Sequence, residues 1–200
     1  MKYAFLSVLC ALFLSVGVTP SLSHASTIAS INELKDVVPT NTNYEAIKSL
    51  AEQWGVIENY PDGMFKPNRS LTHAELAIFL NNSLNKLKKL ATEEKSKLKT
   101  PMGGNESRIK KLTDVSKTAN YYPAIVSLNS NYGIVIKNKQ NQFEPNATIT
   151  YEQLYNILNT IFHYNKTIFA GKANQMVTKG DFCSELNNAL NEATVNLFQK

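Results

Sequence analysis

The 200-residue sequence is poor in cysteine, which limits how the fold can be held together. Of its two cysteines, Cys10 lies in an apolar run at the N-terminus, and Cys183 is the single thiol of the remaining chain. An intramolecular disulfide is then excluded, so packing alone must stabilise the fold. Because Cys183 falls on the apolar face of a helical pattern, we expect it to be a small core residue.

The sequence also lacks the motifs on which catalysis and metal binding commonly depend. Beyond the N-terminal run it keeps two histidines, His73 and His163, with no H-E-x-x-H helix and no metal-spaced Cys/His set. No G-x-S-x-G elbow is present, and Cys183 has no evident base partner. A glycosidase-like pair of carboxylates stays open, because acidic residues are common, but nothing singles one out. We expect a non-enzymatic protein with no catalytic residue, no cofactor and no metal site.

Charge of one sign is concentrated in a single stretch. The formal net charge is +5, from 21 Lys and Arg against 16 Asp and Glu, and lysines gather between Lys86 and Lys111. A run of this kind is ordinarily a solvated helix face. Attraction to anionic wall polymer or lipid headgroups is the non-specific alternative. Basic residues are not interleaved with aromatic ones, so we expect no nucleic-acid partner.

One long apolar run, AFLSVLCALFLSVGV, follows Lys2 and precedes the small residues Ser23 and Ala25. A basic start, an apolar stretch and small residues before a cut at Ser26 are typical of a secretory signal peptide, here residues 1–25. The alternative is an uncleaved membrane anchor, but the run is shorter than the ~20 residues that a span needs. We expect a secreted protein of the cell envelope, in the periplasm or on the cell surface, with no integral membrane segment after cleavage.

The second half of the sequence repeats the first. The stretch that begins at Leu34 aligns without a gap with the stretch that begins at Leu112, at a constant offset of 78. The identical pairs are spread along the alignment and include Asp36/Asp114, Tyr44/Tyr122, Gly55/Gly133, Phe65/Phe143, Pro67/Pro145 and Thr72/Thr150. Chance does not keep such residues in register over this length, so the chain contains an internal repeat.

Each repeat is predicted to consist of a helix, a loop and a second helix. Apolar residues of the first helix recur at spacings of three and four, as on one face of an α-helix: Tyr44, Ile47, Leu50, Ala51 and Trp54. Gly55 and Gly133 then lie where a helix ends in a left-handed cap. Pro61-Asp62-Gly63 predicts a turn, because Pro presets φ, Asp caps local amides and Gly accepts a positive φ.

Two further pairs are given structural roles. Asp36 and Asp114 open each repeat, and we expect each to close its loop by a hydrogen bond to the backbone, with ligand contact as the alternative. Trp54 and Tyr132 lie on the apolar face before the cap glycines, so they are predicted to be core residues rather than sugar-stacking platforms.

The second helix of each repeat begins with a capping box. Thr72 and Glu75 have the S/T-x-x-E spacing, and Thr150 and Gln153 repeat the device. A third cap follows at Thr178. The stretch between repeat two and this cap is too short for another first helix, so we expect a half repeat that has only the second helix. The predicted buried stripes are Leu76, Phe79, Leu80, Leu84 and Leu87; Leu154, Ile157, Leu158 and Ile161; and Phe182, Leu186 and Leu190.

These patterns predict an all-α fold and divide the chain into five parts. They are the signal peptide (1–25), repeat one (31–87), a basic linker (88–111), repeat two (112–163) and a partial third repeat (164–200). The first half of the linker continues the helical pattern of repeat one, and Pro101 breaks it. Whether the half repeat completes a unit within the chain or by self-association with another copy is left open.

The motifs of repeat one resemble those of the S-layer homology domain. They are the Asp-Val start, the helix YEAIKSLAEQWGVI, the loop YPDGMFKPN and the helix start LTHAEL. Repeat two is similar but eroded, and VTKGDF resembles the last helix start of a third repeat. Repeat one is most similar to the domain near the start of cyanobacterial outer-membrane porins. The resemblance implies tandem helix–loop–helix repeats in one small pseudo-symmetric unit. It also implies non-covalent anchoring to cell-wall polysaccharide, often carrying ketal-linked pyruvate, or to peptidoglycan-linked glycan.

The resemblance further implies a ligand groove between neighbouring repeats, beside the start of a second helix. A basic residue just after the capping Thr commonly meets the ligand's carboxylate in that family, and the matching positions are His73, Tyr151 and Lys179. Only Lys179 is reliably cationic, although Arg69 in the same loop could supply charge. The unpaired amides and partial positive charge of a helix N-terminus would favour an anionic sugar substituent there.

Three more residues are candidates for glycan binding. Tyr44, like Tyr121 and Tyr122, lies near the start of a first helix, where it could stack on a sugar. For Asp62 and Gly63 the favoured role is to form the turn, and ligand contact is the alternative. The favoured function is a secreted, non-catalytic module that binds envelope glycan. The alternative is an envelope scaffold for protein interactions whose grooves no longer bind sugar; open grooves would favour the first and covered ones the second.

Overall fold

The computed structural model describes residues 27–58, 60–93, 112–168 and 171–198, with side chains described up to Val195. The predicted signal peptide and residues 94–111 of the predicted linker therefore lie outside the described residues. Within the described part, no helix has both the length and the apolar character that crossing a membrane requires.

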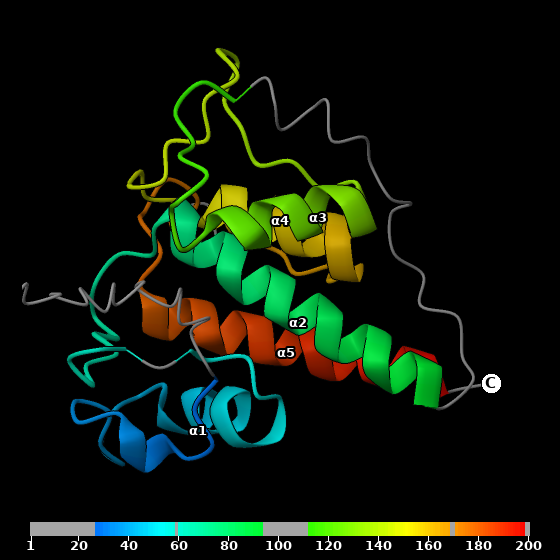
Figure 1. Cartoon of the computed structure of the whole chain (residues 1–200). Coiled ribbons are helices and arrows are strands. Elements are labelled where there is room, and N and C mark those ends of the chain that lie inside the picture. The colour runs from blue at the N-terminus through cyan, green and yellow to red at the C-terminus, as the bar shows by residue number, and fades with distance from the viewer. Residues whose placement is uncertain (1–26, 59, 94–111, 169–170, 199–200) are drawn as a thin grey trace, which may run out of the picture.

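The described residues form an all-α fold, as predicted. The helices are α1 (Tyr44–Lys48), α2 (His73–Glu93), α3 (Tyr122–Tyr132), α4 (Tyr151–Phe162) and α5 (Lys179–Phe198) (Figure 1). Two short helical turns, η1 (Ile31–Glu33) and η2 (Ser49–Gln53), flank α1. Because α2 runs to Glu93, the first residues of the predicted linker belong to this helix.

The first helix of repeat one departs from the prediction. It is α-helical only up to Lys48 and continues as a π-helical turn, in which the amide of Trp54 donates to the carbonyl of Ser49 at 3.0 Å. The wider turn is held from outside, since the Ser49 hydroxyl donates to Asn187 Oδ1 on α5 at 2.8 Å. Trp54 is buried despite the change in helix type, and so is Tyr132 in repeat two, as predicted.

The local signals that bound the elements are confirmed. Gly55 and Gly133 end their helices at φ of +62° and +70°, a region that favours glycine because it has no β-carbon. Thr72 and Glu75 form the expected capping box, with the Glu75 carboxylate accepting from the Thr72 amide at 3.1 Å. Thr150 and Gln153 do the same.

The two aspartates that open the repeats close their loops, as predicted. Asp36 accepts hydrogen bonds from the amides of Phe65 and Lys66, both at 2.7 Å. Asp114 accepts in the same way from residues 143 and 144, at 2.8 and 2.7 Å. A carboxylate that accepts two backbone amides forms strong, charge-assisted bonds, so each aspartate ties the start of its repeat to the loop before the second helix.

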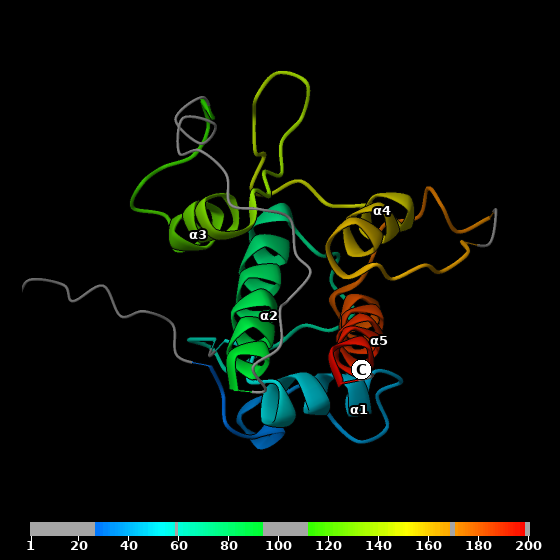
Figure 2. The same cartoon turned by 90° about the vertical axis from the view of Figure 1, so that its right-hand side faces the viewer.

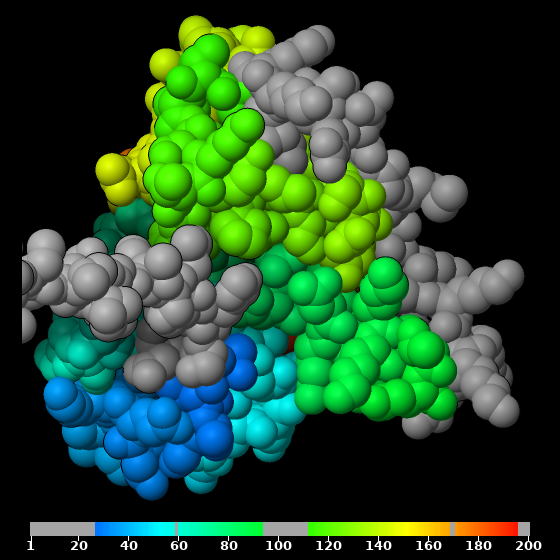
Figure 3. All heavy atoms as spheres, in the orientation of Figure 1, coloured from blue at the N-terminus to red at the C-terminus, as the bar shows by residue number. Residues whose placement is uncertain are grey.

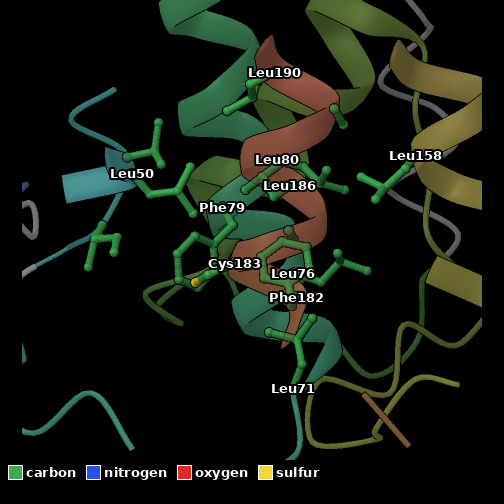
Figure 4. Close-up of a cluster of buried hydrophobic side chains, with 14 of the residues drawn as sticks. Leu50, Leu71, Leu76, Phe79, Leu80, Leu158, Phe182, Cys183, Leu186 and Leu190 are labelled. Carbon is green, nitrogen blue, oxygen red and sulfur yellow. The ribbon is translucent and has the colours of Figure 1, made fainter. Parts of the chain in front are cut away.

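The core lies between α2 and α5, which run side by side (Figure 2). Leu76, Phe79 and Leu80 of α2 face Phe182 and Leu186 of α5 (Figure 4). The rings of Phe79 and Phe182 meet edge to face, with centroids 5.2 Å apart. Full burial of such side chains contributes on the order of 2 kcal/mol each. Cys183 is also fully buried here, and burial raises the pKa of its thiol, as expected of an inert core residue.

The first helix of each repeat packs on a second helix, and these two first helices, α1 and α3, lie at opposite ends of the molecule (Figure 1). α3 packs on α2, where the Tyr132 hydroxyl donates to Asn85 Oδ1 at 2.9 Å, and α1 packs on α5. The first part of repeat one (blue and cyan) and repeat two (light green and yellow) lie at opposite ends of the face shown in Figure 3. The segment that joins α3 to α4 arches beyond both helices (Figure 2).

Three short extended segments join the repeats at the end where α2, α4 and α5 begin. Isolated β-bridges pair Ser70 with Thr178, Thr72 with Thr148, and Thr150 with Met176. Each segment, 70–72, 148–150 and 176–178, therefore pairs with both of the others in a closed ring, which we call the apex. The half repeat supplies the third side of the ring within this chain.

Candidate functional site

At the apex, the start of each of these three helices meets the loop of a different unit. We call the contact of Lys179, the first residue of α5, with Glu75 of α2 the first junction. The second junction brings His73 of α2 beside Gln153 of α4. The third brings Tyr151 of α4 to Asp181 of α5. These pairs are equivalent in position, because each joins the first residue of one helix to the third residue of another.

The backbone amides at these helix starts are occupied. The amides of Lys179, His73 and Tyr151 donate to the carbonyls of Arg69, Ala147 and Gln175 at 2.8, 2.9 and 3.1 Å. The amides of the second residues donate to carbonyls two residues earlier in the same loops, and the amides of the third residues to the capping threonines. The expectation that these amides are unpaired is therefore wrong, because the neighbouring unit supplies their acceptors.

The first junction is closed by an internal ion pair. The Lys179 side chain is only 1% exposed, and its ammonium lies 3.1 Å from Glu75 Oε1. It also donates to the Tyr60 hydroxyl at 3.1 Å and lies over the rings of Tyr60 and Phe65, 4.3 and 4.4 Å from their centroids. Arg69, half exposed, pairs with the same carboxylate from the outer side. Lys179 therefore meets Glu75 rather than solvent.

The charges of this junction are coupled. Burial tends to raise the pKa of the Glu75 carboxyl, but the charge of Lys179 and the hydrogen bonds from Thr72 hold it below its ordinary value of 4.5. Burial lowers the pKa of the Lys179 ammonium, and Glu75 opposes that shift. The two groups compensate for each other's burial, as an ion pair inside a protein must.

The third junction is also closed. Tyr151 is 2% exposed, and its hydroxyl donates to Asp181 Oδ2. The ammonium of Lys172 covers its ring, 4.1 Å from the centroid. Burial, together with the bond to Asp181, raises the pKa of the Tyr151 hydroxyl. Like Lys179, this residue joins two units of the protein to each other.

The second junction is open. A groove of about 520 Å³ lies between α4, the segment after α3 and the start of α2. Its volume falls within the roughly 300–1,000 Å³ that is common for small-ligand sites. The lining comprises His73, Ile134, Val135, Ile136, Lys137, Asn138, Glu144, Ile149, Gln153, Asn156, Ile157, Thr160 and Ile161.

At two positions the groove has smaller side chains than those that fill the first junction. At the offset of 78, Asn138 stands in place of Tyr60, and Ile157 in place of Phe79. His73 takes the position that Lys179 has at the first junction. Ile157 was predicted to be buried but is partly exposed, because it forms part of the groove wall. The sequence reasoning missed Asn138 and Ile157, although these large-to-small changes between aligned repeats were visible.

The remaining predicted residues lie outside this lining. Tyr44 is partly buried against the core at the start of α1. Asp62 pairs with Lys66 at 2.7 Å and accepts from the amide of Met64 at 2.9 Å, so it holds the turn. Gly63 has φ of +68°, which the turn requires. Of the seven residues predicted to bind glycan, His73 lines the groove.

Comparison with known proteins identifies the repeats. The family model of the S-layer homology domain matches residues 33–77 and 111–154. An uncharacterized protein of Nostoc sp. (strain PCC 7120) is 38% identical over 65 residues, which cover 32% of this chain and 11% of that protein. An uncharacterized protein of Synechocystis sp. (strain PCC 6803) is 33% identical over 76 residues, which cover 34% of this chain and 14% of that protein. The match thus spans only a small part of either cyanobacterial relative.

The matched residues agree with the structure. Each match includes the aspartate that closes the loop and ends in the first turns of α2 or α4. Domains of this family are non-catalytic binding modules associated with the cell surface or cell wall. Both repeats of the chain therefore match the S-layer homology domain.

Proposed function

We propose that this protein is a secreted, non-catalytic module that attaches to cell-wall polysaccharide or peptidoglycan-linked glycan through the groove at the second junction. The observation that carries the proposal is the groove itself: of three equivalent junctions in the described residues, the other two are filled by their own side chains. A concave site with apolar walls and a few polar groups is the usual form of a small-ligand site.

The proposal assigns different roles to the predicted residues. His73 is placed in the binding groove. Lys179 and Tyr151 hold the apex together, Arg69 adds an outer charge to the first junction, and Tyr44 packs against the core. Asp62 and Gly63 form the turn of repeat one.

An envelope scaffold for protein interactions is the second candidate. The closed first and third junctions favour it, since a fold kept for its shape alone needs no open groove. The two candidates differ in what happens when the groove is filled. If the protein binds glycan through the groove, filling the groove abolishes attachment. If it is a scaffold, filling the groove leaves its outer surface, and so its protein interactions, unchanged.

The test is a pull-down of the purified protein with cyanobacterial peptidoglycan sacculi, with and without mild acid treatment that strips acid-labile polysaccharide and pyruvate ketals. Thr160→Trp fills the groove from α4, and Asn159→Trp adds the same ring to an exposed position of α4 outside the lining. We expect Thr160→Trp to lose at least about nine-tenths of the binding, which corresponds to more than 1.4 kcal/mol, and Asn159→Trp to bind like the original protein.

The acid treatment identifies the attachment point. Loss of binding after acid assigns the attached polysaccharide, and unchanged binding assigns the peptidoglycan backbone. Equal binding by both tryptophan variants, or no binding at physiological salt, contradicts the proposal and favours the scaffold.

A further inference from the structure

Asp114 is joined to the groove through one peptide unit of the backbone. Its Oδ2 accepts from the amide of Glu144 at 2.7 Å, and the carbonyl of Phe143 is the other end of the same planar peptide unit. That carbonyl oxygen lies 2.7 Å from Nδ1 of His73, which lines the groove. A continuous series of hydrogen bonds therefore leads from a carboxylate outside the lining to an imidazole ring within it.

The direction of these hydrogen bonds determines the tautomer of His73. Because a carbonyl oxygen can only accept, Nδ1 must donate, and Nε2 of the neutral ring then has a lone pair to share. The bond that one ring nitrogen makes decides in this way which of the two is protonated. Among the described residues, Nε2 has no hydrogen-bond partner, so it is free to act as an acceptor.

The carboxylate strengthens the hydrogen bond at the far end of the peptide unit. An N–H group that donates to a charged oxygen polarises its peptide, and the attached carbonyl becomes a better acceptor. A carboxylate that holds a histidine ring in one tautomer by direct contact is a common arrangement in functional sites. Here Asp114 acts on His73 in the same sense, but through the intervening peptide.

The same peptide unit needs Asp114 to keep its orientation. Glu144 has φ of +53°, a left-handed value that is uncommon for residues other than glycine and persists only where the surroundings determine it. Asp114 binds both sides of this residue's neighbour, since its Oδ1 also accepts from the Phe143 amide at 2.8 Å. Without the carboxylate, we expect the Phe143 carbonyl to lose its fixed direction toward His73.

Repeat one has the same aspartate without the connection to a groove. Asp36 holds the matching peptide unit by two bonds of 2.7 Å. The residue there in the position of His73 is Lys179, whose ammonium joins the ion pair of the first junction instead. Both aspartates therefore close a loop, but among the described residues only Asp114 is linked through its peptide to a side chain of the groove.

We propose that Asp114 is a positioning residue of the groove: it holds the His73 ring with the proton on Nδ1 and so presents Nε2 as an acceptor to a bound ligand. This inference rests on the proposed function and deepens it, because it assigns a part in binding to a residue that does not itself line the groove.

The test is a long-range correlation spectrum of the histidine ring nitrogens in the purified, nitrogen-15-labelled protein, recorded at about pH 8, where neutral imidazole predominates. An unprotonated ring nitrogen resonates far downfield of a protonated one, so the spectrum distinguishes the two tautomers. The spectrum of His73→Gln identifies the signals that belong to His73. We expect a protonated Nδ1 and an unprotonated Nε2 in the original protein.

Two matched variants locate the cause. Asp114→Asn removes the charge and one of the two acceptors, so the Nδ1-protonated fraction of His73 should fall to about half or less. Affinity for the sacculi should fall about twofold or more, because it follows the fraction of protein in the binding-competent form. Asp36→Asn loses the same kind of bonds in repeat one, and it should leave both the tautomer and the affinity unchanged. Circular dichroism and thermal unfolding confirm that each variant is folded.

Four results overturn the inference. A protonated Nε2 on His73 in the original protein does so without any variant. The others are a folded Asp114→Asn protein that keeps the original tautomer, an equal shift of the tautomer in Asp36→Asn, and sacculus binding that is unchanged although the tautomer has shifted. Absence of sacculus binding in every protein overturns the proposed function instead. The two failures are distinguishable, because the spectrum needs no ligand.

Discussion

At residue 179 the protein keeps a cation inside the fold, although the sequence places that residue where a ligand contact is expected. The reason is the partner at Glu75, which already belongs to the capping box of α2. An ammonium without such a partner would not be stable at 1% exposure, because removing a charge from water costs several kcal/mol. The ion pair therefore determines that Lys179 points inward.

The pH dependence of stability tests this pair. The folded-state pKa of Glu75 lies below 4.5, so as the pH falls the unfolded chain takes up the proton first. The stabilisation from ionised Glu75 is complete above its ordinary pKa and is lost as the pH falls through the folded-state value. Glu75→Gln should cost on the order of 3 kcal/mol at neutral pH. It should also flatten the decline in unfolding free energy below a pH of about 4.5, measured by urea unfolding at several pH values.

Glutamine keeps the capping geometry, as Gln153 shows in repeat two, so the change isolates the charge. Glu45→Gln, at an exposed position of α1, serves as the control and should leave both stability and its acid dependence unchanged. An acid profile of Glu75→Gln that parallels the original would show that the Lys179 pair does not contribute to stability.

At the scale of elements, α1 and the start of α5 share a contact too close for a side chain at Gly180. A β-carbon there would lie 2.5 Å from Asn43 Nδ2 and 3.3 Å from the Pro67 carbonyl oxygen. Asn43 cannot withdraw without cost, because its Oδ1 accepts from the Ser184 hydroxyl at 2.7 Å. Gly180 also donates its amide to Pro67, so the same residue joins α1, the loop of repeat one and α5.

Gly180→Ala should destabilise the protein by about 1–2 kcal/mol, although alanine is the better helix former by about 1 kcal/mol. Gly171→Ala is the matched control, because a β-carbon there meets nothing within 4 Å, and it should change stability by less than about 0.5 kcal/mol. Chemical denaturation followed by circular dichroism measures both variants. A Gly180→Ala protein as stable as the original would show that the Asn43 side chain can adopt another conformation without a loss of stability.

Features that depend on residues close together in the sequence were predicted well. The capping boxes and the left-handed glycines were correct, and so were the loop-closing aspartates, because each follows from one residue type at a fixed spacing. The π-helical turn was missed because its support, Asn187, comes from the far end of the chain. The burial of Lys179 was missed for the same reason, since its partner Glu75 lies in another unit.

The same distinction applies to the candidate site. His73 was found because it follows a capping threonine, a local signal. Asn138 and Ile157 matter because they fail to fill a space that Tyr60 and Phe79 fill elsewhere. A single repeat cannot show such a difference. It requires the two repeats to be superposed in three dimensions, or their sequences to be compared position by position for side-chain size.

At the scale of the whole molecule, the apex and the shared core join both repeats into one unit. The core contains residues of α2, α4 and α5 together with Leu50 from the first helix of repeat one (Figure 4). Trp54, which follows the same helix, also belongs to it. Because each extended segment of the apex pairs with the other two, one repeat cannot detach without breaking pairings of the other. Equilibrium unfolding is therefore expected to be cooperative.

Leu158→Ala tests this cooperativity from a distance. Leu158 lies fully buried in repeat two, so its truncation should cost about 3 kcal/mol, whereas truncation of the partly exposed Ile157 should cost less than about 1 kcal/mol. The fluorescence of Trp54, the only tryptophan, reports on repeat one. In Leu158→Ala, the midpoint of urea unfolding followed by Trp54 fluorescence should fall by the same amount as the midpoint followed by circular dichroism. A Trp54 transition that stays in place while the circular dichroism shifts would show that the repeats unfold independently.

Residues 176–198 are the last of the described segments to be made, yet they contact both repeats. Segment 176–178 pairs with residues near Ser70 and Thr150, and α5 covers one side of α1. Repeat one therefore lacks part of its contacts until α5 has been made. Contacts between distant parts of a chain are also slow to form. The complete fold is then expected to form late, once α5 has been made, rather than repeat by repeat.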